Sequence, residues 1–182
     1  MTSVQLQVSK LDAARRQLET AIRLYFHEAD PVSIHTLTAA GYELLRHLKK
    51  KAGGELMLKD WLLEGVKPEF RREVADSLNE AQNFFKHSDR DSSATLDFNP
   101  EQTEWLLLDA CDAYRKLASE LVPALRVYQL WSWTHWARRF IQDQEWDRSM
   151  ASVDPKTWDK PKAEFYGFWL PIGSAAGAVS QE

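Results

Sequence analysis

The sequence predicts an all-α fold: an antiparallel bundle of four to five helices followed by a tryptophan-rich, partly irregular C-terminal extension. Apolar residues recur at steps of three and four through the first 124 residues, and helix-start signals punctuate this pattern. No segment alternates between apolar and polar residues as a half-buried strand does. The 182 residues, 44% of them apolar and 27% charged, are enough to bury a core. Helices with one apolar stripe bury it against each other, which favours a bundle.

The first two helices have clear start signals. Ser9, followed three residues later by Asp12, resembles a capping box and predicts a helix over about 9–27. Asp30 puts a side-chain acceptor before Pro31, which suits the first helical position, so a second helix is predicted over about 31–52. Apolar residues then follow at helical spacing: Leu11, Ala14, Leu18, Ile22 and Tyr25 in the first helix, and Ile34, Leu37, Leu44, Leu45 and Leu48 in the second.

Prolines mark the next two helices. Pro68 opens a third helix, which is predicted to end near His87. A turn-rich segment follows, and Asn99 with Pro100 repeats the cap-then-proline signal before a long fourth helix that Pro123 closes or bends. The apolar stripe of the third helix consists of Phe70, Val74, Leu78, Ala81 and Phe85.

The last third of the chain differs in composition, because residues 125–182 hold six of the eight tryptophans. We therefore expect two parts, a helical bundle over 1–124 and an added module over 125–182. A further helix is predicted over about 124–147. Three later prolines and a small-residue ending then predict an irregular strap and a frayed terminus.

Composition narrows the class of protein. A net charge of −4 argues against broad electrostatic capture of nucleic acid, although a local basic site could still act. The first residues lack the apolar stretch of a signal peptide, and no window reaches the length of a membrane span, so we expect a soluble cytoplasmic protein without membrane contact. Cys111, the single cysteine, lies in an apolar helical run and is expected to be buried. No cofactor is predicted.

The segment Asn83–Asp91 gathers an amide, a histidine, two carboxylates and two cations around the predicted end of the third helix. On a helical projection, Asn83 and His87 lie opposite the apolar stripe. His87 is therefore not needed by the core. It either caps the last carbonyls of the helix, where the dipole favours a cation, or belongs to a functional site.

The residues from Gln82 to His87 resemble the short motif RNxxxH of HEPN domains, helical bundles in which this motif closes the third helix before a polar loop and a long fourth helix. The resemblance covers about residues 9–124. It implies a homodimer that binds RNA or a nucleotide in a groove between protomers and cleaves RNA without a metal. His87 would then be the general acid–base and Asn83 its polar support, while Lys86 and Arg90 would offset phosphate charge.

One position departs from this motif, because Gln82 stands where the family has arginine. A guanidinium stabilises a phosphoryl transition state with two charged hydrogen bonds, and losing such a donor costs on the order of 3 kcal/mol. Enzymatic activity is therefore left open. The alternative is a noncatalytic module for dimerisation or for binding another protein.

A metal site is a further alternative. His87, Asp89 and Asp91, completed by His35 or His27, would suit a divalent cation. The same carboxylates are also typical of a solvated turn, in which they accept hydrogen bonds from backbone amides. We favour the turn and predict no metal site.

Overall fold

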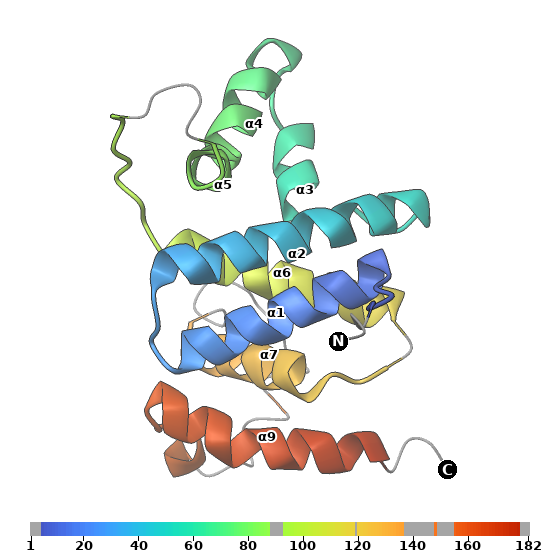
Figure 1. Ribbon diagram of the computed structural model, residues 1–182, viewed down its shortest axis with the longest axis vertical. Coiled ribbons are helices and arrows are strands. Elements are labelled where there is room, and N and C mark those ends of the chain that lie inside the picture. The colour runs from blue at the N-terminus through green and yellow to red at the C-terminus, as the bar shows by residue number, and fades with distance from the viewer. Residues whose placement is uncertain (1–4, 88–92, 119, 137–147, 149–154, 179–182) are drawn as a thin grey trace.

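The computed structural model describes residues 5–87, 93–118, 120–136, 148 and 155–178. Within these ranges the protein is helical and contains no strand, so the predicted all-α bundle is confirmed. The described residues form five longer α-helices and three shorter ones. Figure 1 shows the longer helices packed together and the shorter ones rising from one side of α2. The longer helices are α1 (Lys10–Phe26), α2 (Pro31–Lys51), α6 (Glu101–Leu117), α7 (Pro123–His135) and α9 (Lys162–Ala178), and the shorter ones are α3 (Leu58–Glu64), α4 (Arg71–Leu78) and α5 (Glu80–Phe84).

The start signals of α1 and α2 act as the sequence predicts. The Ser9 hydroxyl accepts a hydrogen bond from the backbone N–H of Asp12 at 3.0 Å. The Asp30 carboxylate accepts one from the backbone N–H of Ser33 at 2.8 Å, and Pro31 is the first residue of α2. Each side chain pairs an N–H that has no partner within the helix, which fixes both helix starts.

The core lies between α1, α2, α6 and α7. Gly41 of α2 lets α1 approach closely, because a Cβ at this position would lie 3.1 Å from the Leu18 side chain. Cys111 is fully buried, as expected, and burial raises the pKa of its thiol. The larger side chains with no exposed surface are those of Leu18, Ile22, Phe26, Tyr42, Leu45, Leu107, Cys111 and Tyr128.

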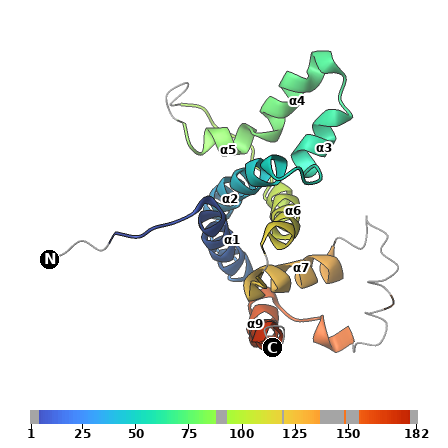
Figure 2. The same ribbon diagram turned by 90° about the vertical axis from the view of Figure 1, so that its right-hand side faces the viewer.

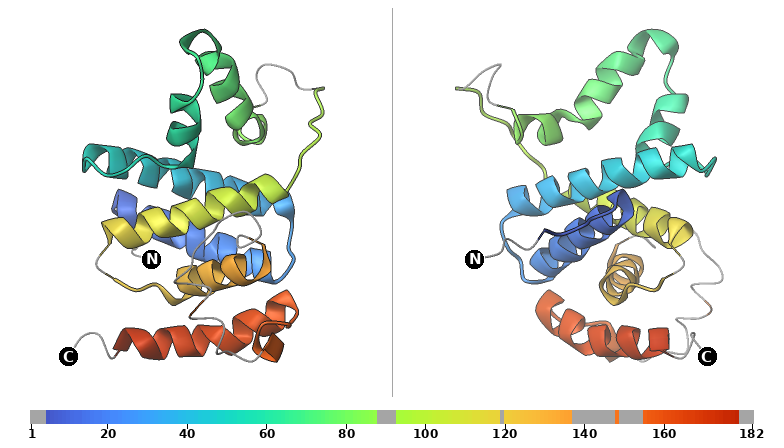
Figure 3. Two further views of the ribbon diagram at one scale, coloured as in Figure 1. Left: turned by 180° about the vertical axis from the view of Figure 1, so that it is seen from behind. Right: turned by 45° about the vertical axis from the view of Figure 1, so that its right-hand side comes forward.

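The C-terminal helices extend this core. Figure 3 shows α7 between α6 and α9. The buried ring of Phe165 on α9 stacks on Phe26 of α1 at 6.2 Å between ring centroids, and meets Trp131 of α7 edge-on at 5.0 Å. Residues before and after position 124 thus share one core. Whether 125–182 forms a module of its own remains a prediction.

The irregular strap predicted after residue 147 is wrong for residues 162–178, which form α9. Proline in a helix removes one hydrogen bond and clashes with the preceding turn, and α9 contains Pro171. The helix forms nevertheless because Phe165 is buried and Trp169 and Leu170 pack against the core. Residues 137–147, the later part of the helix predicted over 124–147, lie outside the described residues. The frayed terminus was predicted from the small-residue ending 173–182, of which 173–178 belong to α9 and 179–182 lie outside the described residues.

The third predicted helix is divided in the structure. A short 3₁₀ turn, η1 (Pro68–Phe70), precedes α4, and the chain bends at Asn79 before α5 begins. The separate helix α3 lies between the second and third predicted helices, where no helix was predicted. Figure 2 shows α3, α4 and α5 projecting from α2 on the side away from α9. We call residues 58–84 the arm.

None of the helices in the described ranges combines the length and the apolar character that crossing a membrane requires.

Candidate functional site

The predicted site residues lie at the end of α5. This helix ends at Phe84, three residues before the predicted end at His87. The backbone carbonyl of Asn83 accepts hydrogen bonds from the N–H groups of both Lys86 and His87, at 3.2 and 3.1 Å, which closes the last turn. The side chains of Asn83, Lys86 and His87 are all exposed. Arg90, the second predicted phosphate-binding residue, lies outside the described residues.

Asn83 and His87 line an open groove of about 930 Å³ along α4 and α5. The structure therefore brings these two predicted residues together, whereas Lys86 does not line the groove. The apolar contribution to its lining comes mainly from Phe84. The described residues that line it are Glu69, Arg72, Glu73, Asp76, Ser77, Glu80, Asn83, Phe84, His87 and Ala94.

The groove is acidic. Among its described lining residues, four carry carboxylates, and the guanidinium of Arg72 is the only arginine or lysine cation. Arg72 lies 4.0 Å from the carboxylate of Asp76, its neighbour one turn along α4, and both side chains are strongly exposed. The described lining therefore carries a net negative charge, which attracts cations and repels polyanions.

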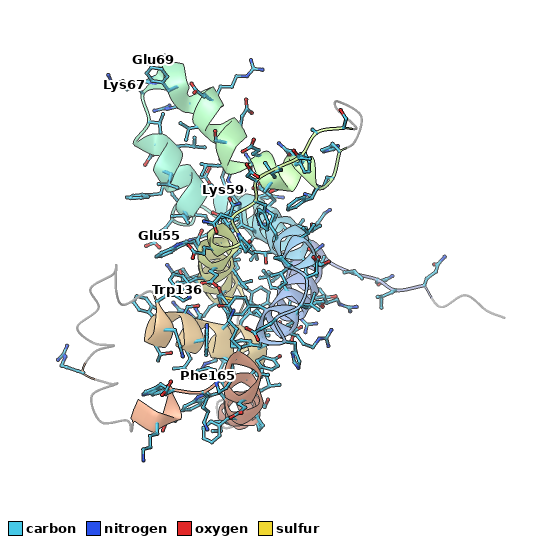
Figure 4. All side chains as sticks on the ribbon, turned by 90° about the vertical axis from the view of Figure 1, so that its left-hand side faces the viewer. Glu55, Lys59, Lys67, Glu69, Trp136 and Phe165 are labelled. Atoms are coloured by element: carbon cyan, nitrogen blue, oxygen red, sulfur yellow. The ribbon has the colours of Figure 1, made fainter. Side chains whose placement is uncertain are left out.

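A second cation lies at the base of the arm, on its inner side. The side chain of Lys59 is only 2% exposed, and Figure 4 shows the residue where the arm joins the bundle. Its ammonium donates a hydrogen bond to the Asn79 side-chain oxygen at 2.8 Å and lies 3.5 Å from that of Gln82. It also pairs with the Glu43 carboxylate at 3.4 Å. Lys59 thus ties α4 and α5 to α2.

The surroundings of Lys59 keep it in place. Its backbone N–H donates to the Tyr42 hydroxyl at 3.1 Å, and its ammonium lies 5.3 Å from the centre of the Tyr42 ring. That hydroxyl donates in turn to Asp109 at 2.9 Å. Burial lowers the pKa of Lys59, while the charge of Glu43 raises it. The ammonium is therefore occupied inside the protein and does not reach the groove as a charge for a ligand.

The contacts of Lys59 explain why glutamine occupies position 82, where the HEPN motif has arginine. Gln82 does not leave a vacant place for a cation, because its side-chain oxygen faces the ammonium of Lys59. An arginine at position 82 would bring a second positive charge toward that ammonium. Glutamine is therefore the residue that fits the interior of this arm.

His35 is the other histidine near the end of α5. It lies on α2, edge-on to Phe85 and Phe98, at 5.8 and 5.1 Å between ring centroids. Its Nδ1 shares a hydrogen bond with the Thr103 hydroxyl at 2.9 Å. Burial, with the nearby charges of Lys59 and Lys86, lowers the pKa of His35 to about 4.

Metal binding finds no support among the described residues, where no group of three or more His, Cys, Asp and Glu side chains could hold an ion. The predicted alternative used His87, Asp89 and Asp91, and both aspartates lie outside the described residues. His35, named as a further ligand, is buried and already pairs with Thr103.

Sequence reasoning missed Lys59. A lysine is almost never fully buried unless it is paired, so its position in the sequence gave no reason to select it. A weak signal was present, because Lys59 lies among the apolar residues Leu58, Trp61, Leu62 and Leu63. The partners that explain its burial come from three other helices or their ends and could not be identified from spacing.

Comparisons with models of known protein families, with curated proteins and with solved structures give no match to this chain. The likeness to HEPN domains therefore rests on the motif and helix order of the sequence alone.

Proposed function

We propose that this protein is a noncatalytic interaction module, and that the groove along α4 and α5 receives a cationic segment of a partner protein. The proposal is based on the negative charge of the groove walls. The described lining holds one arginine, Arg72, and no lysine, against four carboxylates: Glu69, Glu73, Asp76 and Glu80. A lysine- or arginine-rich segment would be steered toward such a surface, because complementary potentials speed encounter and select partners.

Exposed aromatic side chains support the same proposal. Phe70 is 52% exposed, next to Glu69 of the groove, and Phe84 lines the groove with 37% of its surface exposed. Aromatic side chains are enriched where proteins bind each other, because they bury a large area at a small cost in conformational entropy. An amphipathic helix with basic and apolar faces would satisfy both features.

Catalysis on RNA has weaker support. A phosphate group at His87 would enter a groove lined by four carboxylates. The buried ammonium of Lys59 is not available to offset the phosphate charge, because it already pairs with Glu43 and Asn79. A polyanion requires the opposite sign of charge at its site.

RNA or nucleotide binding with ribonuclease activity is the second candidate, and one observation favours it. His87, the general acid–base implied by the HEPN resemblance, and Asn83, its polar support, line the same groove. A homodimer belongs to this candidate, since the family places its groove between two protomers. Sedimentation of the purified chain measures that state.

Fluorescence anisotropy of the full chain tests the two candidates together. The probes are a labelled amphipathic peptide with lysines on one face and leucines on the other, the same peptide with glutamates in place of lysines, and a single-stranded RNA. We expect the basic peptide to bind, and its affinity to fall as salt is raised. The acidic peptide and the RNA should bind at least tenfold more weakly.

Charge-reversed variants locate the binding. The double substitution Glu73→Lys with Glu80→Lys should reduce the affinity for the basic peptide at least tenfold, because it reverses the charge of the groove. Glu64→Lys is the matched control, since Glu64 is an exposed carboxylate on α3 that does not line the groove. Equal binding by wild type and the double variant would contradict the proposal. RNA cleavage that His87→Ala abolishes would establish the second candidate instead.

A further inference from the structure

A second cavity lies in the bundle, where the end of α1 meets the beginnings of α2, α6 and α9. Its volume is about 220 Å³, which is the scale of a small metabolite rather than of a drug-sized ligand. Its described lining shares no residue with the groove of the arm, so a ligand in this cavity is independent of the proposed function. The cavity is lined by Tyr25, Glu28, Ala29, Pro31, Ile34, Pro100, Thr103, Glu104, Leu107 and Lys162.

Glu104 is the polar centre of this cavity. One of its carboxylate oxygens, Oε1, accepts a hydrogen bond from the Tyr25 hydroxyl at 2.9 Å. That hydroxyl is itself held by the indole N–H of Trp131, which donates to it at 3.1 Å. The chain of contacts fixes the carboxylate in one orientation. Among the described residues no side chain donates to the other oxygen, Oε2, so it remains available to a ligand.

The charge of Glu104 is incompletely compensated. Burial raises the pKa of this carboxyl, whereas the hydrogen bond from Tyr25 and the more distant charge of Lys162 lower it. A ligand cation in hydrogen-bond contact with Oε2 would stabilise the charged form.

The cavity as a whole carries excess negative charge. The described lining holds two carboxylates, those of Glu28 and Glu104, and one ammonium, that of Lys162. Glu28 has a backbone φ of +50°, a conformation that glycine adopts more easily, yet it places a carboxylate at the rim. A cationic ligand therefore suits the cavity better than an anion or a neutral molecule.

Lys162 indicates how an ammonium group fits here. Its Nζ lies 3.9 Å from the centre of the Tyr25 ring, a cation–π contact within the cavity. The apolar part of the remaining lining comes from Ala29, Ile34, Leu107 and two prolines, and Thr103 adds a hydroxyl that shares a hydrogen bond with His35. Together these groups form a carboxylate acceptor, an aromatic face and an aliphatic wall.

We propose that this cavity binds a small primary amine, whose ammonium donates to Oε2 of Glu104 and whose short aliphatic chain packs against Ile34 and the two prolines of the lining. Lys162 competes with the ligand, because it brings the same kind of charge to the same site. The two charged residues then have opposite effects on affinity: Glu104 increases it and Lys162 reduces it.

Isothermal titration calorimetry of the full chain tests this proposal with three probes of similar size. Isopentylamine carries the ammonium alone, isovalerate carries a carboxylate alone, and leucine carries both. We expect isopentylamine to bind most tightly and isovalerate not to bind. Absence of isopentylamine binding, or leucine binding as tightly as isopentylamine, would overturn the assignment.

Two nearly isosteric substitutions give the sharper test. Glu104→Gln keeps an oxygen that can accept from Tyr25 but removes the charge, and should weaken isopentylamine binding about tenfold. Lys162→Met should strengthen it roughly threefold, because the competing charge is gone. Circular dichroism confirms that both variants are folded. A weaker affinity in Lys162→Met, or an unchanged affinity in Glu104→Gln, would contradict the proposed geometry.

Discussion

The bundle and the arm of this protein are held together by different forces. In the bundle, apolar side chains from five helices meet in a single core, and Leu18, Phe26 and Leu107 have no exposed surface. In the arm, α4 has no buried residue at all. Buried Lys59 with its polar partners and the ion pair between Arg46 and Asp60 at 2.6 Å attach the arm to α2 instead. Both regions are helical, so secondary structure does not reveal this difference.

The way in which a helix is attached to the protein decides how much of its apolar surface stays exposed. A helix that is held by burial of its apolar face has little of that face left for another molecule. The arm is held at its base by Lys59, and its aromatic residues Trp61 and Phe70 remain 63% and 52% exposed. A polar attachment thus leaves apolar and acidic surface available for a partner.

The largest expected effect is on the free energy of unfolding, when the same substitution is made at a leucine of the core and at a leucine of the arm. Leu18→Ala in the core should lower the free energy of unfolding by about 4 kcal/mol, because the substitution removes buried apolar surface and leaves a cavity. Leu78→Ala in α4, where the side chain is half-buried, should cost about 1 kcal/mol. Urea unfolding followed by circular dichroism measures both. Equal losses would show that the arm has a packed core of its own.

A second prediction concerns pH at the junction of the two regions. His35 contacts Thr103 of the bundle and Phe85 beside the arm, and its pKa is lowered to about 4 from an ordinary value of about 6.5. Between these values the unfolded chain binds a proton that the folded chain does not. Stability should therefore fall as pH is lowered from about 6.5 to about 4, by about 3 kcal/mol.

The variant His35→Asn isolates this contribution. Asparagine can still reach the Thr103 hydroxyl but does not titrate, so its unfolding free energy should depend less on pH in that range. The measurement is urea unfolding at a series of pH values for both proteins. Parallel pH profiles for wild type and variant would contradict the assignment to His35.

The smallest expected effect is a change in stability when Gln82, which contacts Lys59 in the arm, is replaced by a charged residue. Gln82→Arg places a cation beside the ammonium of Lys59 and should destabilise the protein by about 1 kcal/mol. Gln82→Glu places an anion there and should stabilise it by roughly 0.5 kcal/mol. Thermal unfolding gives both signs. A stabilising arginine would mean that Lys59 does not face this side chain in solution.

Local signals predicted the beginnings of α1 and α2. Ser9, Asp30 and Pro31 act within four residues along the chain, so their effect can be worked out from spacing alone. The grouping of Asn83 with His87 was also predictable, because both lie on one face at the end of the same helical segment. The break at Asn79 was not predicted; there the side-chain amide donates to the Ala75 carbonyl and accepts a hydrogen bond from Lys59, twenty residues earlier.

The sequence by itself determined the helical class, the starts of α1 and α2 and the polar character of the segment around His87, because these follow from periodicity and from contacts between near neighbours. Only the tertiary structure decided that Lys59 is buried, that α9 is a helix despite Pro171, and that His87 lines an acidic groove. Each of these depends on side chains brought together from distant parts of the chain. Burial and summed charge are properties of those assembled surroundings, and no local pattern contains them.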